Sequence, residues 1–187
     1  ILGDFIYDSR EYKIGDDGYI RYIGESYKPT FLKGCTNYAH MFEKYNYFKI
    51  DLSDWDTTGV TNMSYMFYKS ILTTINVGDF NTSEVKDTSY MFGYIPASRI
   101  YGLKFLDTSK VINMRGMFIC SRVQQINLEN WDTSNVEDIE RMFYYCNYLL
   151  YIIGFDELNL SKVKYMDNLY YNHITDKSDI SLIYEDY

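Results

Sequence analysis

The stretch WDTSNVEDIERMFYYC, residues 131–146, recurs along the chain and decides how the chain is organised. A near copy, WDTTGVTNMSYMFYKS, occupies residues 55–70, and looser versions begin at residues 80, 106 and 158. A Met-Phe pair marks the units from residue 41 onward, with steps of 25, 25, 26, 25 and 27 residues, and is degraded to Leu-Tyr in the last unit. A period of about 20–29 residues is typical of leucine-rich repeats, so the sequence predicts one structural unit repeated and stacked.

Each unit carries apolar residues at positions i, i+3, i+6 and i+7, which is the pattern of one face of a short helix. Because about three turns of helix are marginal alone, we expect the helix to be stabilised by the neighbouring units. The predicted repeat core consists of Val60, Met63, Met66, Phe67, Val85, Met91, Phe92, Val111, Met114, Met117, Phe118, Val136, Ile139, Met142 and Phe143.

A triplet of the Asp/Asn-Thr-Ser type precedes most of these apolar faces. Such side chains accept hydrogen bonds from the free N–H groups at a helix start, and Ser134 with Glu137 also matches a capping box. The predicted helix caps are Thr58, Ser83, Ser109, Ser134 and Ser161.

Short alternating segments precede the triplets: KIDLSDW from residue 49, TINVGDF from 74 and QINLENW from 125, with a weaker third unit around Tyr101, Leu103 and Leu106. This period of two indicates short strands. The predicted fold class is therefore an α/β solenoid like a leucine-rich repeat, with one short parallel strand and one short helix in each coil and about five coils.

The predicted domain is a single unit of residues 1–187 with three parts. Residues 1–29 alternate around Asp17-Gly18 and are expected to form a hairpin that covers the first coil. Residues 30–170 hold the repeats, and residues 171–187 break the pattern and are expected to close the other end.

The phrases IDLSDWDTTGVTNMSYMF and INLENWDTSNVEDIERMFYYC carry a resemblance to known repeat families. They resemble BspA-like leucine-rich-repeat surface proteins and, more closely, the mycoplasma-lipoprotein repeat domain of unknown function. The resemblance covers roughly residues 30–170, although the third unit lacks the usual strand and the fifth replaces Met-Phe. It implies a secreted or cell-envelope location and a binding role, often adhesion, and it supplies no catalytic residue.

The composition excludes some classes of partner. The chain has 187 residues and a net charge of −8, which argues against nucleic acid and anionic membrane surfaces because both favour a basic face. No apolar run approaches the roughly 20 residues that span a bilayer, so we expect no direct membrane insertion.

Few residues are candidates for chemistry. His40 lies off the apolar stripe and is expected to face solvent, and neither it nor His173 is expected to be catalytic. The repeated acidic position, beginning at Asp56, is expected to form turns and caps, with Ca²⁺ binding as the alternative. Cys120 and Cys146 are expected to be buried thiols, with a disulfide between neighbouring repeats as the alternative. We expect no metal and no cofactor.

Tyrosine supplies 22 residues, and its large apolar face with a hydrogen-bonding tip suits interfaces. The alternative is that these rings only cover the spaces between helices.

We expect a non-enzymatic binding or adhesion module, extracellular or on a cell surface, with a protein or glycan partner. The alternative is a structural part of an assembly, such as a virion decoration or envelope-lattice protein, for which self-assembly is possible. The candidate binding residues are Tyr65, Tyr68, Tyr90, Tyr94, Tyr144 and Tyr145.

Overall fold

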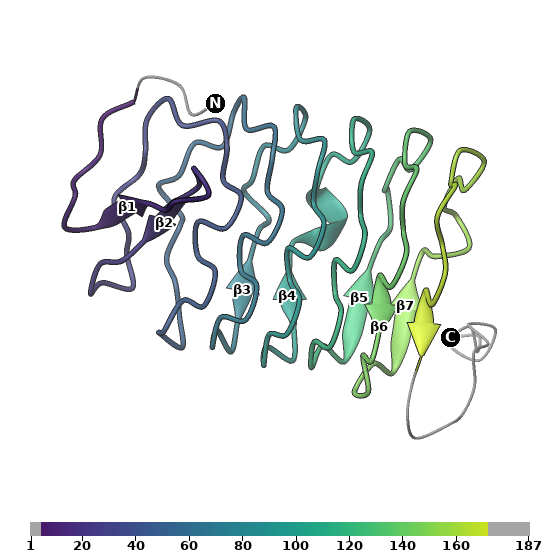
Figure 1. Cartoon of the computed structure of the whole chain (residues 1–187). Coiled ribbons are helices and arrows are strands. Elements are labelled where there is room, and N and C mark those ends of the chain that lie inside the picture. Colours follow the sequence, from purple (N-terminus) through teal and green to yellow (C-terminus); the bar gives the residue numbers. More distant parts are fainter. Residues whose placement is uncertain (1–4, 172–187) are drawn as a thin grey trace.

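The computed structural model describes residues 5–171 as a row of stacked coils, in which each repeat makes one coil (Figure 1). Short strands and tight turns make up the coils, and one 3₁₀ turn, η1, spans Leu103–Phe105. The strands are β1 (Tyr12–Ile14), β2 (Ile20–Tyr22), β3 (Ile75–Asn76), β4 (Ile100–Tyr101), β5 (Gln125–Asn127), β6 (Phe143–Tyr144), β7 (Tyr151–Ile153) and β8 (Tyr170–Tyr171).

These strands form four two-stranded sheets. β1 and β2 are antiparallel and make a hairpin whose turn contains Gly18, with a φ of 81°. The other pairs, β3 with β4, β5 with β7 and β6 with β8, are parallel and join equivalent positions of different coils. The segment from residue 49, predicted as a strand, has no strand, whereas the weak third unit contains β4. All but the first residue of the predicted closing segment, 171–187, lies outside the described residues.

The predicted fold class is wrong, because residues 5–171 contain no α-helix in any coil. Alternate N–H groups of the predicted helix bond to the next coil instead: those of Met63, Tyr65 and Phe67 donate to the carbonyls of residues 87, 89 and 91. Of the N–H groups between them, that of Met66 donates to the carbonyl of Met63, three residues back, and that of Ser64 donates to the Asn62 side chain, so both close tight turns. The apolar spacing i, i+3, i+6, i+7 therefore arises from consecutive turns.

Two residues of each turn segment lie in the left-handed region of backbone conformation, four positions apart. In the unit at residues 55–70 these are Tyr65 and Lys69, with φ of 56° and 57°. A residue in this conformation cannot continue an α-helix and costs roughly 1–2 kcal/mol unless it is glycine. The inter-coil hydrogen bonds offset this strain, because each coil repeats the same turns in register with the next.

The register between coils is fixed by one position that pairs in parallel along the whole stack. The paired residues are Asn37, Asn62, Asp87, Asn113, Asp138 and Tyr165. In the first five of these, the Asn or Asp side chain accepts a hydrogen bond from the N–H two residues on, at 2.8 Å in Asn62 and Asp138. Such Asx turns hold the chain in the bend that starts each turn segment.

The interior is filled by the apolar residues of every coil, and the structure buries each residue of the predicted repeat core. The phenylalanines of the Met-Phe pairs stack on one another through the centre. Their ring centroids are 5.8, 5.9, 5.6 and 5.8 Å apart between Phe42, Phe67, Phe92, Phe118 and Phe143. A core of this kind belongs to no single coil, so each coil depends on its neighbours.

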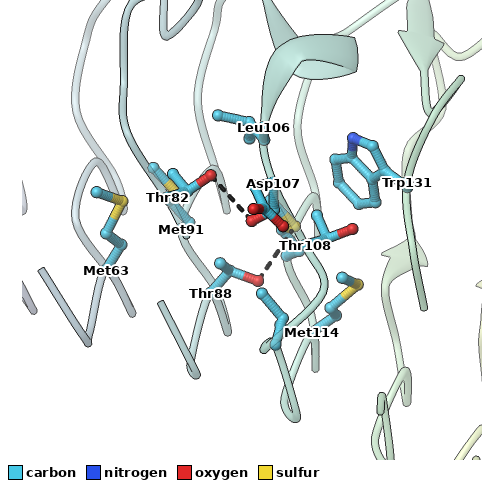
Figure 2. A pocket seen from close by; sticks show the side chains of 11 residues that line it. Met63, Thr82, Thr88, Met91, Leu106, Asp107, Thr108, Met114 and Trp131 are labelled. Carbon is cyan, nitrogen blue, oxygen red and sulfur yellow. Dashed lines mark hydrogen bonds between the residues drawn. The ribbon is translucent and has the colours of Figure 1, made fainter. Parts of the chain in front are cut away.

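The triplets predicted as helix caps have other roles, because no helix follows them. The Asp or Asn accepts the hydrogen bond from the N–H of the residue predicted as the cap, as Asp107 does from Ser109 at 3.0 Å. The threonine between them is buried and donates its hydroxyl to a carbonyl of the next coil, as Thr108 does to Asp132 at 3.0 Å. Figure 2 shows the same bond from Thr82 to Asp107, beside a void of about 10 Å³ between the coils. The triplet therefore links coils and does not begin helices.

Candidate interaction surface

The residue that precedes the Met-Phe pair is aromatic in the first three units, and these three side chains form a column. The rings of His40 and Tyr65 stack at 4.7 Å with an interplanar angle of 7°, and those of Tyr65 and Tyr90 at 4.7 Å with 15°. All three residues have positive φ, which turns their side chains outward from the same point of successive coils. The strained backbone position thus builds a continuous aromatic stack on the surface.

Two further tyrosines extend this stack sideways. The ring of Tyr68 makes edge contacts with Tyr65 at 5.1 Å, with Tyr90 at 6.2 Å and with Tyr94 at 5.4 Å. Lys69 places its ammonium 5.2 Å from the centroid of Tyr68 and 5.3 Å from that of Tyr94. We call His40, Tyr65, Tyr68, Tyr90 and Tyr94 the tyrosine face.

Three phenols of the tyrosine face, those of Tyr65, Tyr68 and Tyr94, have raised pKa values. Burial, with smaller contributions from Tyr90 and Tyr68, raises the pKa of Tyr65 to about 12. A hydrogen bond with Cys120, followed by burial, raises the pKa of Tyr94 to about 12. Tyr94 is nevertheless 44% exposed, and the other four members are half-buried. The surface therefore combines apolar ring area with phenol hydroxyls.

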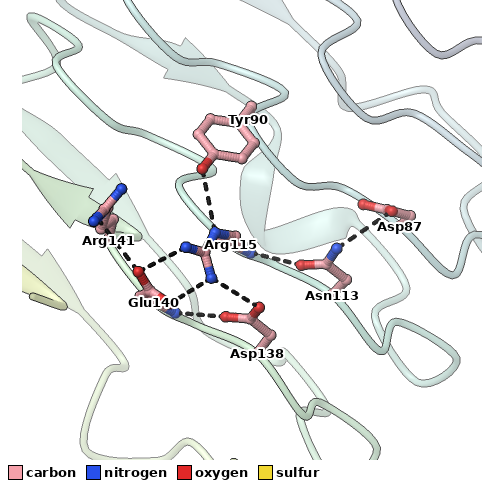
Figure 3. Close-up of polar contacts among 7 residues, drawn as sticks. All are labelled: Asp87, Tyr90, Asn113, Arg115, Asp138, Glu140 and Arg141. Carbon is pink, nitrogen blue, oxygen red and sulfur yellow. Dashed lines mark hydrogen bonds and ion pairs between the residues drawn. The ribbon is translucent and has the colours of Figure 1, made fainter. Parts of the chain in front are cut away.

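One end of the stack is closed by an ion-pair network (Figure 3). Gly116 takes the column position after Tyr90, and a Cβ there would lie 2.6 Å from the Tyr90 ring. The neighbouring Arg115 donates its Nε to the Tyr90 hydroxyl at 3.3 Å and its guanidinium to both carboxylate oxygens of Glu140. Burial alone would lower the pKa of Arg115, but its bonds with Tyr90 and Glu140 raise it above the ordinary value. The arginine thus fixes the position of the last ring.

The other end is closed by the β1–β2 hairpin. Tyr19 lies against His40 with ring centroids 4.8 Å apart, and Arg21 pairs with Glu43 at 3.2 Å. The Nδ1 of His40 is 2.8 Å from Glu43 Oε2, and the His40 side chain is only 19% exposed. The prediction that His40 faces solvent is therefore only partly right, because its side chain reaches the surface but the rings of Tyr19 and Tyr65 cover much of it.

The structure places Tyr144 and Tyr145 in a second cluster. Their rings contact each other at 4.5 Å, and each contacts Tyr171, at 5.6 and 5.1 Å. The ring contacts of Tyr65, Tyr68, Tyr90 and Tyr94 are instead with other members of the tyrosine face. Four of the six predicted binding tyrosines therefore lie together, and two lie apart.

The sequence of the chain matches one known family. The family model described as "Mycoplasma protein of unknown function, DUF285" matches residues 31–97 and 99–182. The chain belongs to this family. It matches none of the curated proteins or solved structures with which it was compared. The DUF285 match agrees with the resemblance to a mycoplasma repeat domain, whereas the resemblance to BspA-like leucine-rich repeats is not confirmed.

Three further expectations for this DUF285 chain concern a metal site, a disulfide and membrane insertion. Within residues 5–171, no three His, Cys, Asp or Glu side chains are grouped as a metal site would require. The cysteines at 120 and 146 are free thiols, so the alternative of a disulfide is not found. In the same range, no helix has the length and apolarity that a membrane crossing requires.

The sequence prediction missed several members of this surface. His40 occupies the same offset before Met-Phe as Tyr65 and Tyr90, so the repeat alignment could have assigned it to the column. The contacts of Lys69 and Arg115 depend on the backbone of the turn segments, in which Lys69 and Gly116, the neighbour of Arg115, have positive φ. A helical interpretation places those side chains differently, and so no sequence signal could have shown their contacts.

Proposed function

We propose that the chain is a non-enzymatic protein-binding module that uses the tyrosine face as its contact surface. The observation that carries this proposal is the continuous stack of His40, Tyr65 and Tyr90 with Tyr68 and Tyr94 beside it. Tyrosine supplies much of the binding energy at protein interfaces, since it combines apolar area with a hydrogen-bonding tip. The rings are already fixed by their mutual contacts, so little side-chain entropy is lost on binding.

The stacking favours a protein over a glycan at this surface. Both faces of the Tyr65 ring are covered, by His40 on one side and Tyr90 on the other. A sugar ring packs on an exposed aromatic face, whereas a protein partner can contact ring edges and hydroxyls. The tyrosine face offers mainly edges and hydroxyls. We place the module outside the cell or on its surface, as the family resemblance suggests, with a virion as the alternative.

The test compares two double variants of the whole chain. Tyr68→Ser with Tyr94→Ser removes the two outer rings of the tyrosine face without changing the inner stack. The matched control is Tyr27→Ser with Tyr148→Ser, because these tyrosines are 48% and 51% exposed and also contact a cation. A photo-crosslinking residue at position 69 identifies the partner, and its affinity for each variant is then measured by biolayer interferometry.

We expect the Tyr68/Tyr94 variant to bind at least about tenfold more weakly, which corresponds to about 1.4 kcal/mol, while the control binds normally. Equal affinities for the wild type and the Tyr68/Tyr94 variant would remove the tyrosine face from the interface. Sedimentation of the isolated chain distinguishes the alternative: self-association that this variant abolishes would assign the face to contacts between copies in an assembly.

A further inference from the structure

The strand ladder between coils is interrupted between β4 and β5. β4 pairs with β3, and β5 pairs with β7, but no described sheet joins β4 to β5. This is where the repeat step is 26 residues and where η1 follows β4. Figure 1 shows β4 and β5 as neighbours in the row of arrows. A surface depression of about 250 Å³ occupies this interruption.

The depression is lined by two cations, two exposed aromatic rings and two amides. Tyr101 is 49% exposed and Phe105 is 65% exposed, and no ring contact is found for either within the described part of the chain. No other ring of the described residues covers them, and the Lys104 ammonium lies over one face of Phe105, 5.5 Å from its centroid, so the remaining exposed ring surface is open to a ligand. The lining side chains that carry this chemistry are Arg99, Tyr101, Lys104, Phe105, Gln125 and Asn127.

The charge of the depression differs from that of the whole chain, which is −8. Within residues 5–171, Arg99 has no ion-pair partner, so its guanidinium can take an external anion. Lys104 lies 3.9 Å from Glu129 and 5.5 Å from the Phe105 ring, so its charge is partly balanced. One unpaired cation therefore stands beside exposed aromatic faces.

The shape of the depression is formed in advance. Gly102 has a φ of 84°, and a Cβ there would lie 2.3 Å from Gly78, so the two coils touch through glycine backbones. The hydroxyl of Tyr151 donates to Gln125 Oε1 at 3.0 Å, which leaves the Gln125 Nε2 to donate elsewhere. The Asn127 amide is already bonded to Glu129 through both its oxygen and its nitrogen.

We propose that this depression binds a sugar residue that carries a carboxylate. The carboxylate pairs with Arg99, whose planar guanidinium suits two parallel hydrogen bonds. The C–H face of the sugar ring packs on Phe105 and Tyr101, and a ring hydroxyl accepts a hydrogen bond from Gln125. An acidic peptide side chain would use Arg99 but would leave both rings uncovered. The volume is below that of sites for drug-sized ligands and suits about one sugar ring.

The probe is 3′-sialyllactose, with lactose as the neutral comparison, in an NMR titration of the isotope-labelled chain. We expect sialyllactose to shift the signals of residues 99–105 and 125–127 and to bind at least about tenfold more tightly than lactose. Arg99→Gln should remove this preference, and Phe105→Ser should weaken both ligands. The controls are Arg122→Gln and Phe48→Ser; Phe48 is 68% exposed and lies outside the depression.

Equal binding of lactose and sialyllactose, or an unchanged preference in Arg99→Gln, would overturn the proposal. Tighter binding of inorganic phosphate or of a polyglutamate peptide than of sialyllactose would also overturn it, in favour of a general anion site. The Tyr68/Tyr94 variant should keep its sugar binding, because it leaves every lining residue unchanged. The outcome is therefore independent of the function proposed for the tyrosine face.

Discussion

A buried hydroxyl links each coil to the next one. Thr57, Thr82, Thr108 and Thr133 are each at most 4% exposed and donate to a carbonyl 24–26 residues ahead. These bonds are part-buried, and a carbonyl that loses its partner where water has little access costs more than the net value of an average hydrogen bond. The threonine of the triplet is therefore expected to matter more to stability than the serine that follows it.

Thr108→Val removes this hydroxyl and leaves the Asp132 carbonyl without its donor. We expect the free energy of unfolding to fall by about 1–3 kcal/mol, measured by urea denaturation. The control is Thr73→Val, since the Thr73 hydroxyl makes a similar bond, to Phe48 at 3.1 Å, but is exposed to water. Equal losses for both variants would mean that the buried hydroxyl has no special role.

Lys44→Gly tests the backbone conformation of the turn segments. Lys44 has a φ of 57°, so glycine should relieve roughly 1–2 kcal/mol of strain and lose about 0.5–1 kcal/mol to chain entropy. We expect the variant to be as stable as the wild type or slightly more stable. Lys86→Gly is the control, because Lys86 does not have a positive φ, and it should lose about 0.5–1 kcal/mol. A helix at residues 37–45 would instead make Lys44→Gly destabilising.

At the scale of one element, the turn segment is held by what lies above and below it. Phe92 is buried and stacks on Phe67 at 5.9 Å and on Phe118 at 5.6 Å, so it contributes to three coils. We expect Phe92→Ala to lower the free energy of unfolding by about 3–5 kcal/mol in denaturant titrations. Phe48→Ala, at a ring that is 68% exposed, should change it by less than about 0.5 kcal/mol. A loss below about 1 kcal/mol for Phe92→Ala would contradict the central stack.

The secondary structure itself can be measured. Because residues 5–171 contain short strands and turns but no α-helix, we expect a far-UV circular dichroism spectrum without the paired minima of a helical protein. One helix per repeat would give about a third of the residues in helices, as in an average globular domain. A helical signal of that size would contradict the turn segments.

At the scale of the whole molecule, acid should loosen the stack through its repeated aspartates. The side-chain and backbone hydrogen bonds from the residue two positions on lower the pKa of Asp56, Asp107 and Asp132. A carboxyl with a lower pKa in the folded state stabilises it fully above the unfolded pKa of about 3.9 and loses this as pH falls through the folded pKa. Urea denaturation at pH 7, 5 and 3 should therefore show a loss below about pH 4.

Replacing Asp56, Asp107 and Asp132 with Asn should make this loss smaller while stability at pH 7 is kept. Asn already occupies the same position at residues 81 and 159 and accepts the same bond, at 3.1 and 3.0 Å. A control that replaces the exposed Asp16, Asp79 and Asp156 with Asn removes the same charge. If both triple variants have the same pH profile, net charge and not the turns is responsible.

The sequence by itself determined the repeat, its period and the residues of the interior. Val60, Met66 and Phe92 are buried as the apolar pattern required, because any packing of 25-residue units must cover these side chains. The hairpin around Gly18 was also predictable, since its turn requires a residue that tolerates positive φ. The sequence further placed Tyr65, Tyr68, Tyr90 and Tyr94 at repeated offsets, which is why they lie together.

Only the tertiary structure decided between helices and stacked turns. Both arrangements bury the same i, i+3, i+6, i+7 positions, so periodicity could not distinguish them. The difference lies in the partner of each N–H group: Tyr65 bonds to Ser89 of the next coil, 24 residues ahead, and not to a residue one turn back. Such bonds exist only once neighbouring coils are in register. The aromatic stack, the ion-pair network at Arg115 and the depression beside β5 all follow from that register.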